Sequence, residues 1–198
     1  MIEFRQADVR DATFLVPLIA EASGGVWPAM WRALANDGET VEESGARYLA
    51  DLANKLSVEN TIVAELEGVR VGMMSCYQEE SRLSSAQDSG GQVALPTDLT
   101  LALKPYRELS DPHSLFVAEL CCLEEARGKG LGTRLLNQAK REALSLGLPR
   151  VTLRVFSENT GAIRLYERSG FHMVDQRVVI AHSDIAVSGS VLLMSCAL

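Results

Sequence analysis

The segment from residue 114 to residue 146 constrains the fold of this chain more than any other. It opens with the apolar run SLFVAELCCL, passes through the loop sequence RGKGLG, and ends in a helical pattern. The apolar stripe of this predicted helix is formed by Leu131, Leu135, Ala139 and Leu146, and Gly147 follows as its C-terminal cap. A buried strand, a glycine-rich loop and an amphipathic helix in succession indicate a domain that mixes strands and helices.

The loop in this segment suits an anionic ligand. Its three glycines let the backbone adopt positive φ and approach a ligand closely, and Arg127 and Lys129 add positive charge. The helix that follows exposes unpaired N–H groups and the positive end of its dipole. We therefore predict a phosphate cradle of backbone amides, although a tight turn with solvated basic side chains fits the same residues.

The glycine spacing argues against two common nucleotide sites. A Walker loop requires G-x-x-x-x-G-K-[ST], which the chain lacks. A dinucleotide fingerprint requires G-x-G-x-x-G, but Thr133 stands where the last glycine belongs, and the loop lies late in the chain. A nucleotide-dependent oxidoreductase is therefore a weak alternative.

Alternation and helical periodicity predict the other elements. Strands are expected at 2–7, 61–66, 69–78, 150–156, 171–181 and 190–197. Helices are expected at about 12–22, capped by Asp11 and kinked by Pro17, at about 42–56 and at 159–169. GGVWPAMW is interpreted as a break between the first two helices. The polar span Glu79–Pro112 is interpreted as an insertion or lid with a short helix near 99–109, within one domain of residues 1–198.

Two motifs, in order and at the right spacing, resemble the signatures of the GNAT superfamily of N-acetyltransferases. R-x-x-G-x-G, at Arg127, Gly130 and Gly132, resembles the acetyl-CoA signature. SENTGAIRLYERSGF resembles the second signature, whose matching residues are Asn159, Ala162, Leu165, Tyr166, Glu167, Gly170 and Phe171. The resemblance is strong over residues 115–171, and the order of the N-terminal elements agrees with it. Residues 79–112 are longer than the usual connection.

The resemblance implies an α+β GNAT fold: a mixed, twisted sheet of about seven strands, splayed between its fourth and fifth strands, with about four helices. Acetyl-CoA would lie in the splay, its pantetheine arm against the backbone near residues 120–123 and its pyrophosphate on the amides of residues 127–133. The residues implied to bind it are Leu120, Cys122, Leu123, Arg127, Gly128, Lys129, Gly130, Leu131, Gly132, Thr133, Asn159, Ala162 and Tyr166.

The implied reaction carries an acetyl group from a thioester to an amine. A lysine-like amine has a pKa near ~10.4, so a carboxylate is needed to take its proton, directly or through water. Glu119 is the candidate base, because it is the only carboxylate in SLFVAELCCL and alternation puts it on the face opposite Leu120 and Cys122. A solvated face, or an ion pair with an arginine, would explain the same residue.

Tyr166 is the candidate acid that protonates the leaving thiolate, by its match to the tyrosine of the second motif. A core tyrosine on the apolar face of its helix fits the same position. The backbone amides of Cys122 and Leu123, at an expected irregularity of the strand, are candidates for stabilising negative charge on the carbonyl oxygen. Asn159 is expected to cap its helix and also, by the resemblance, to contact the CoA arm.

Composition excludes several classes of partner. The net charge of -7 and a pI near 5.0 argue against a nucleic-acid or anionic-membrane binder. The chain shows no signal-like apolar core and no run of the ~20 apolar residues that a membrane span needs. The four cysteines and three histidines match no metal-ligand spacing, so we expect reduced thiols, no metal and a cytoplasmic location.

The acceptor is left open as a small amine, an amino acid or a protein amine. Trp27, Trp31 and the 79–112 span either line its site or belong to the core. A non-catalytic CoA-binding sensor or regulatory module on the same fold is the main alternative to an enzyme. A homodimer is common in the family, although no feature of this sequence requires one.

Overall fold

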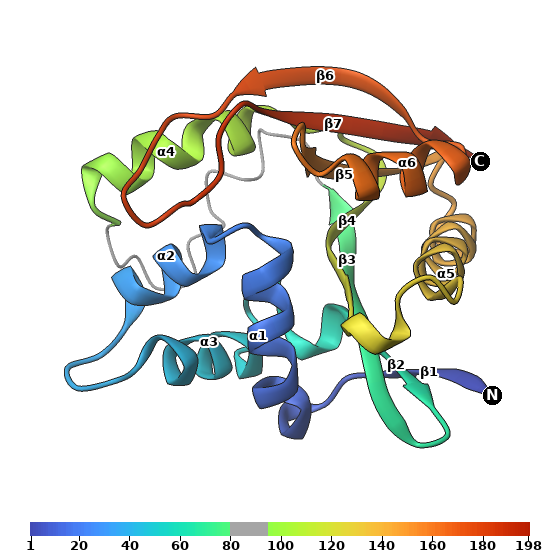
Figure 1. Ribbon diagram of the computed structural model, residues 1–198, viewed down its shortest axis with the longest axis horizontal. Helices are drawn as coiled ribbons and strands as arrows, with labels where there is room; N and C mark the ends of the chain where they lie inside the picture. The colour runs from blue at the N-terminus through green and yellow to red at the C-terminus, as the bar shows by residue number, and fades with distance from the viewer. Residues whose placement is uncertain (80–94) are drawn as a thin grey trace.

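The computed structural model of the protein describes residues 1–79 and 95–198. One seven-stranded sheet carries helices on both of its faces (Figure 1). Its strands are β1 (Ile2–Gln6), β2 (Thr61–Leu66), β3 (Val69–Glu79), β4 (Ser114–Cys122), β5 (Arg150–Phe156), β6 (His172–Val178) and β7 (Ser190–Ala197). The helices are α1 (Ala12–Ala22), α2 (Val26–Leu34), α3 (Val41–Ala50), α4 (Thr97–Glu108), α5 (Leu131–Ser145) and α6 (Thr160–Arg168). None of these helices is long and apolar enough to cross a membrane.

The sheet has the order β1-β2-β3-β4-β5-β7-β6, and β4 and β5 are its only parallel neighbours among the described strands. These two strands pair only from Leu115 to Val117, opposite residues 151–153. Beyond that point β4 continues to Cys122 and β5 to Phe156 without pairing to each other. The predicted splay between the fourth and fifth strands is therefore confirmed.

A β-bulge marks the place where the strands part. Ser75 pairs with Glu119 and Cys76 pairs with Val117, so Ala118 is an extra residue in β4. A bulge bends and twists its strand, which turns the end of β4 away from β5. The irregularity predicted at Cys122 and Leu123 is thus misplaced, because it lies at Ala118.

Two apolar layers cover the sheet. On one face, α5 packs its stripe of Leu131, Leu135 and Ala139 against the strands, together with Tyr166 of α6. On the other face, helices α1, α2 and α3 form a core that includes Leu15, Ile19, Trp31, Leu49, Val63 and Met73. Leu146, which was predicted to join the stripe of α5, is 51% exposed, because α5 has already ended.

The helix α2 replaces the break predicted at GGVWPAMW. The break is confined to Gly24 and Gly25, which have φ of +58° and +95°, and α2 begins at the next residue. Pro28 does not prevent the helix, because it lies in the first turn, where its missing N–H leaves no bond unmade. Likewise α3 ends at Ala50 instead of Leu56, and α1 continues through Pro17.

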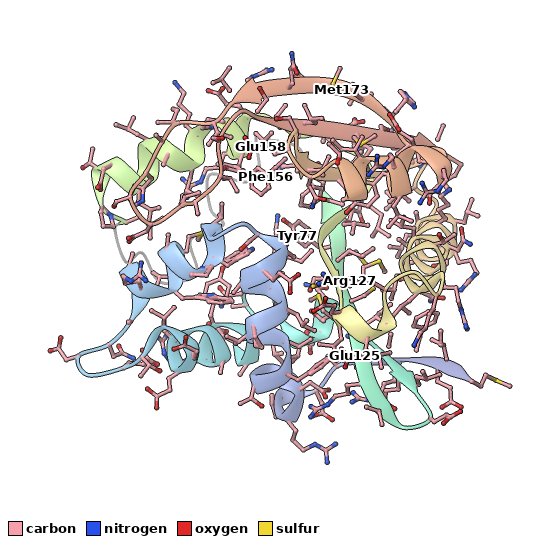
Figure 2. All side chains as sticks on the ribbon, viewed as in Figure 1. Tyr77, Glu125, Arg127, Phe156, Glu158 and Met173 are labelled. Atoms are coloured by element: carbon pink, nitrogen blue, oxygen red, sulfur yellow. The ribbon has the colours of Figure 1, made fainter. Side chains whose placement is uncertain are left out.

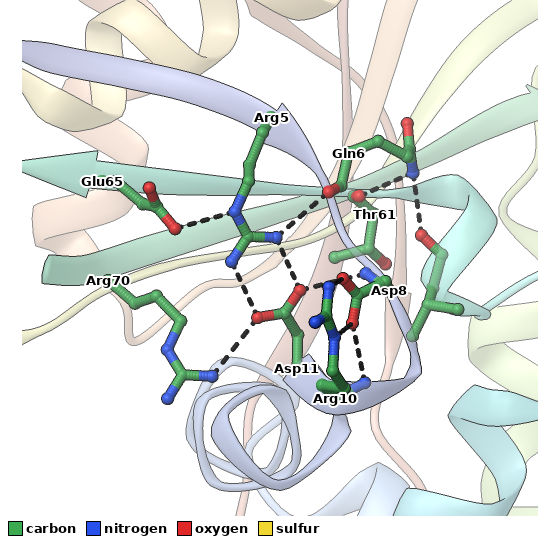
Figure 3. Close-up of polar contacts among 9 residues, drawn as sticks. Arg5, Gln6, Asp8, Arg10, Asp11, Thr61, Glu65 and Arg70 are labelled. Atoms are coloured by element: carbon green, nitrogen blue, oxygen red, sulfur yellow. Dashed lines mark hydrogen bonds and ion pairs between the residues drawn. The ribbon is translucent and has the colours of Figure 1, made fainter. Parts of the chain in front are cut away.

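Asp11 precedes α1 but does not cap it with its side chain. The carboxylate accepts hydrogen bonds of 2.6 and 2.9 Å from Arg5 and one of 3.2 Å from Arg70 (Figure 3). These contacts join β1, β3 and the start of α1. The Arg5 guanidinium, opposed by burial, holds the pKa of Asp11 well below its usual range.

The described part of the predicted insertion belongs to the core. Helix α4 buries Leu99, Ala102 and Leu103 in a third apolar cluster, which also contains Ala29 of α2 and Ile185 from the segment between β6 and β7. Helix α4 is therefore a packed part of the domain. The rest of the predicted lid, residues 80–94, lies outside the described residues.

Candidate active site

A cavity of about 620 Å³ opens where β4 and β5 diverge. Tyr77 of β3 and Phe156 of β5 both line this space and lie on opposite sides of it (Figure 2). We name its two parts after the nearest helices. The α6 side is lined by Leu120, Asn159, Ala162, Leu165 and Tyr166. The α2 side is lined by Trp27, Met30, Tyr48, Tyr77, Phe116 and Glu119.

The glycine loop leads into the N-terminus of α5. Gly128 and Gly130 have φ of +72° and +78°, which glycine adopts without strain, and a Cβ at either position would meet no atom within 4 Å. Arg134 is the first residue whose N–H donates back to the loop, to the carbonyl of Gly130 at 3.1 Å. The N–H groups of residues 131–133 therefore face outward, in the arrangement that binds anions at helix N-termini.

Gly132 has a different role from the other two glycines. A Cβ at this position would lie 2.8 Å from Cδ2 of Leu165 on α6. The missing side chain thus lets α5 and α6 approach each other, a role that no local pattern in the sequence indicates.

The basic side chains of the loop segment do not all point at the anion site. The Arg127 guanidinium pairs with Glu21 of α1, and its Nε donates to the carbonyl of Cys122 at 3.0 Å. Its charge is therefore already neutralised, which corrects the expectation that this side chain adds charge to the loop. Lys129 is exposed at the loop itself.

The backbone N–H groups at the C-terminal end of β4 point in two directions. Leu123 donates its N–H to the carbonyl of Val71 in β3 at 2.9 Å, so this amide is engaged and the expectation for it as an oxyanion donor is wrong. Successive N–H groups of a strand point to opposite sides. The N–H groups of Leu120 and Cys122 consequently point away from β3, toward the side where β5 leaves the sheet.

Glu119 lies on the α2 side, opposite the face of Leu120 and Cys122, as alternation predicts. The indole Nε1–H of Trp27 donates to its carboxylate at 2.8 Å. The Trp27 ring is held by Trp31 and Tyr48, at centroid distances of 6.1 and 5.4 Å. Desolvation raises the pKa of Glu119 to about 8, against the lowering effects of the Trp27 hydrogen bond and the Arg154 charge.

Tyr166 lines the cavity from α6 and is 8% exposed. Its ring packs against Phe171 at a centroid distance of 6.0 Å, so it is also a core residue. Burial, followed by the nearby charge of Glu119, raises the pKa of this phenol, which keeps it protonated at neutral pH. Asn159 caps α6 as predicted, because its side chain accepts the N–H of Ala162 at 3.1 Å.

Sequence reasoning missed four residues that surround Glu119. Tyr48, Tyr77 and Phe116 supply aromatic surface, and Arg154 of β5 lies with its guanidinium 4.4 Å from the centre of the Phe116 ring. Arg154 is held by the carbonyl of Leu109 at 2.8 Å and by Glu79 at 3.3 Å. These residues come from four elements, and no local pattern in the sequence links them.

The family model for the acetyltransferase (GNAT) family matches residues 27–171, which include the loop, Glu119 and Tyr166. The chain belongs to this family. YwnH of Bacillus subtilis (strain 168), provisionally named a phosphinothricin acetyltransferase, is 29% identical over 127 residues, which span 64% of this chain and 74% of YwnH. A mycothiol acetyltransferase of Corynebacterium aurimucosum is 38% identical over 61% of this chain, but the match spans only 40% of that protein.

Solved structures agree with the GNAT fold. An N-acetyltransferase from Staphylococcus aureus Mu50 superposes with a TM-score of 0.71 at 16% identity, covering 98% of this chain and 99% of that one. A GNAT acetyltransferase from Streptococcus pneumoniae gives a TM-score of 0.58 at 20% identity over the whole of both chains. At these identities the likeness concerns the fold alone.

Proposed function

We propose that this GNAT protein is an acetyl-CoA-dependent N-acetyltransferase that acetylates a primary amine by direct attack. One observation carries the proposal: a carboxylate whose pKa is near 8 and a protonated phenol line the same cavity, at the divergence of β4 and β5. This pair suits a reaction in which one group must lose a proton and another must gain one.

The residues on the α6 side fit acetyl-CoA. The outward amides of residues 131–133 and the open backbone at Gly128 and Gly130 suit a pyrophosphate. The N–H of Leu120 is available to an amide-bearing chain that lies beside β4, and the N–H of Cys122 is available to the acetyl group at the end of that chain. When bound, acetyl-CoA supplies an activated acetyl thioester.

The residues of the chain then divide the proton transfers. Glu119, when ionised, takes a proton from the acceptor ammonium, directly or through water, so that the nitrogen lone pair can form the new N–C bond. The N–H of Cys122 is positioned to donate to the acetyl carbonyl oxygen. As the C–S bond breaks, Tyr166 gives its phenolic proton to the departing thiolate, and the nitrogen gives its second proton to the Tyr166 phenolate through water, which leaves a neutral amide and a protonated phenol. Glu119 releases the proton that it took to solvent.

Two measurements test this proposal in sequence. The first is a calorimetric titration with acetyl-CoA, with NADH and ATP as controls; we expect micromolar binding of acetyl-CoA and no binding of either control. The second is amine-dependent release of free thiol over a library of primary amines. Absence of acetyl-CoA binding would overturn the cofactor assignment. Binding without transfer to any amine would favour the non-catalytic module.

A further inference from the structure

The α2 side of the cavity selects its acceptor by shape and charge. Resting on the proposed function, we infer that the acceptor is a small amine with one positive charge and an apolar or aromatic body. The shape and the charges of the α2 side exclude acceptors that carry a second cationic group and acceptors that are polypeptides.

The walls beyond Glu119 are aromatic and apolar. Trp27 and Tyr48 form one wall, and Tyr77 and Phe116, with a centroid distance of 5.5 Å, form another. Met30 and Leu56 also line the space. Such walls gain free energy by covering apolar surface of a ligand, and the electron-rich rings of Trp27 and Tyr48 favour an ammonium near Glu119.

The lining of the cavity offers no second carboxylate to a second cation. Glu119 is the one acidic side chain among the described residues that line it. Arg154 is basic but already paired with Glu79, whereas Arg107 is exposed and adds a positive charge to the lining. A second ammonium on the acceptor would therefore lose hydration against the apolar walls and meet Arg107, with no carboxylate besides Glu119 among the described lining residues.

The cavity is bounded on its outer side by packed segments. The segment between β6 and β7 lies against α2, where Arg32 and Asp184 form an ion pair of 2.7 Å (Figure 1). Gly25 is so close to this segment that a Cβ would lie 3.1 Å from the carbonyl oxygen of Asp184. Ile185 is buried with Ala29 and Leu99 in the cluster that joins α2 to α4. An extended polypeptide would need a groove where this core lies.

The exclusion of acceptors with a second positive charge is tested with two amines that differ at one end. n-Hexylamine and 1,5-diaminopentane have the same length, but a methyl group in the first stands where the second has an ammonium. We expect kcat/KM for n-hexylamine to be higher by about tenfold or more at the same pH and equal total amine concentration. Binding of both amines to the CoA complex, followed by tryptophan fluorescence, should show the same preference without turnover.

Charge reversal on α4 provides the matched variants. Arg107→Glu changes an exposed residue that lines the cavity, and Lys104→Glu makes the same change on an exposed residue of the same helix that does not line it. We expect Arg107→Glu to reduce the preference for n-hexylamine several-fold and Lys104→Glu to leave it unchanged. Equal effects of the two variants would show that the cavity charges do not set the preference.

The exclusion of polypeptide acceptors is tested with 2-phenylethylamine and a tetrapeptide whose free N-terminal residue is phenylalanine. We expect acetylation of the first and none of the second. If the diamine or the peptide is acetylated as well as its partner, the inference is overturned, while the proposed function stands. If acetyl-CoA binds but no amine releases thiol, the proposed function falls, and the inference falls with it.

Discussion

The two sides of the cavity are built in opposite ways. The α6 side and the glycine loop come from one continuous stretch, in which β4, the loop, α5, β5 and α6 follow one another from residue 114 to residue 168. The α2 side gathers its residues from α2, α3, β3 and β4, and its central hydrogen bond joins Trp27 to Glu119, 92 positions apart in the sequence. If the proposed function holds, a local motif specifies how the donor is held, whereas tertiary packing specifies which acceptor is used and at what pH.

The largest effect is expected at Tyr166, where the two sides meet. Tyr166→Phe removes the proton donor and keeps the ring against Phe171, so kcat should fall on the order of 10³-fold while acetyl-CoA affinity is retained. Stopped-flow thiol release and calorimetry measure the two quantities. Tyr106→Phe is the control, because Tyr106 lines the same cavity and its buried hydroxyl has no hydrogen-bond partner among the described residues. A Tyr166→Phe protein with normal kcat would remove the acid assignment.

Glu119→Gln should lower kcat about 10²-fold and change the pH profile. Glu119 acts as a base only when ionised, and its pKa is about 8. In the unaltered protein, kcat/KM corrected for the ammonium form of the acceptor should therefore rise with pH through about pH 8 and level off above it. In the variant that rise should disappear. If the rise of kcat/KM with pH persists in Glu119→Gln, a titratable group other than Glu119 causes it.

Gly130→Ala tests the glycine loop, which comes from the same continuous stretch as the α6 side. An alanine at φ +78° is strained by roughly 1–2 kcal/mol, so the loop should shift and acetyl-CoA binding should weaken by about tenfold, equally for every acceptor. Gly147→Ala is matched to it, because Gly147 has φ +67°, follows the other end of α5 and also has open space around it. Both variants should lose similar thermal stability, but only the first should lose affinity. If the two variants bind acetyl-CoA with equal affinity, the glycine loop does not bind the cofactor.

The α6 side and the fold around it are largely predictable from the sequence. The strand, the glycine loop, the helix stripe and the Asn159 cap are local patterns, and the structure shows each of them in place. The splay follows from the family resemblance. The bulge at Ala118, which accompanies it, leaves no mark in the sequence, since a bulge depends on the register between two strands.

The residues of the α2 side could not be predicted from local sequence patterns in the same way. Glu119 was identified because a charge inside an apolar strand needs a reason, but its partner was not, since nothing local links a tryptophan of α2 to a carboxylate of β4. The helix α2 itself was missed, because two glycines and a proline suggest a break until their positions relative to the first turn are known. Arg127 was assigned to the loop by its charge and by its place in the R-x-x-G-x-G motif, whereas its guanidinium pairs with Glu21 of α1.

The smallest effect, and the most specific one, is expected from Trp27→Phe. Phenylalanine keeps most of the ring contact with Tyr48 but cannot donate to Glu119, and because that hydrogen bond lowers the pKa of Glu119, its loss should raise this pKa further. The midpoint of the pH profile should then move to higher pH, and activity at pH 7 should fall by up to about tenfold while the high-pH plateau is retained. Trp31→Phe is the control: Trp31 neighbours Trp27 in the same cluster, but its buried Nε1–H has no partner among the described residues. A packing defect would lower the plateau in either variant, so a shifted midpoint in Trp27→Phe alone would show that α2 sets the pH at which the base on β4 works.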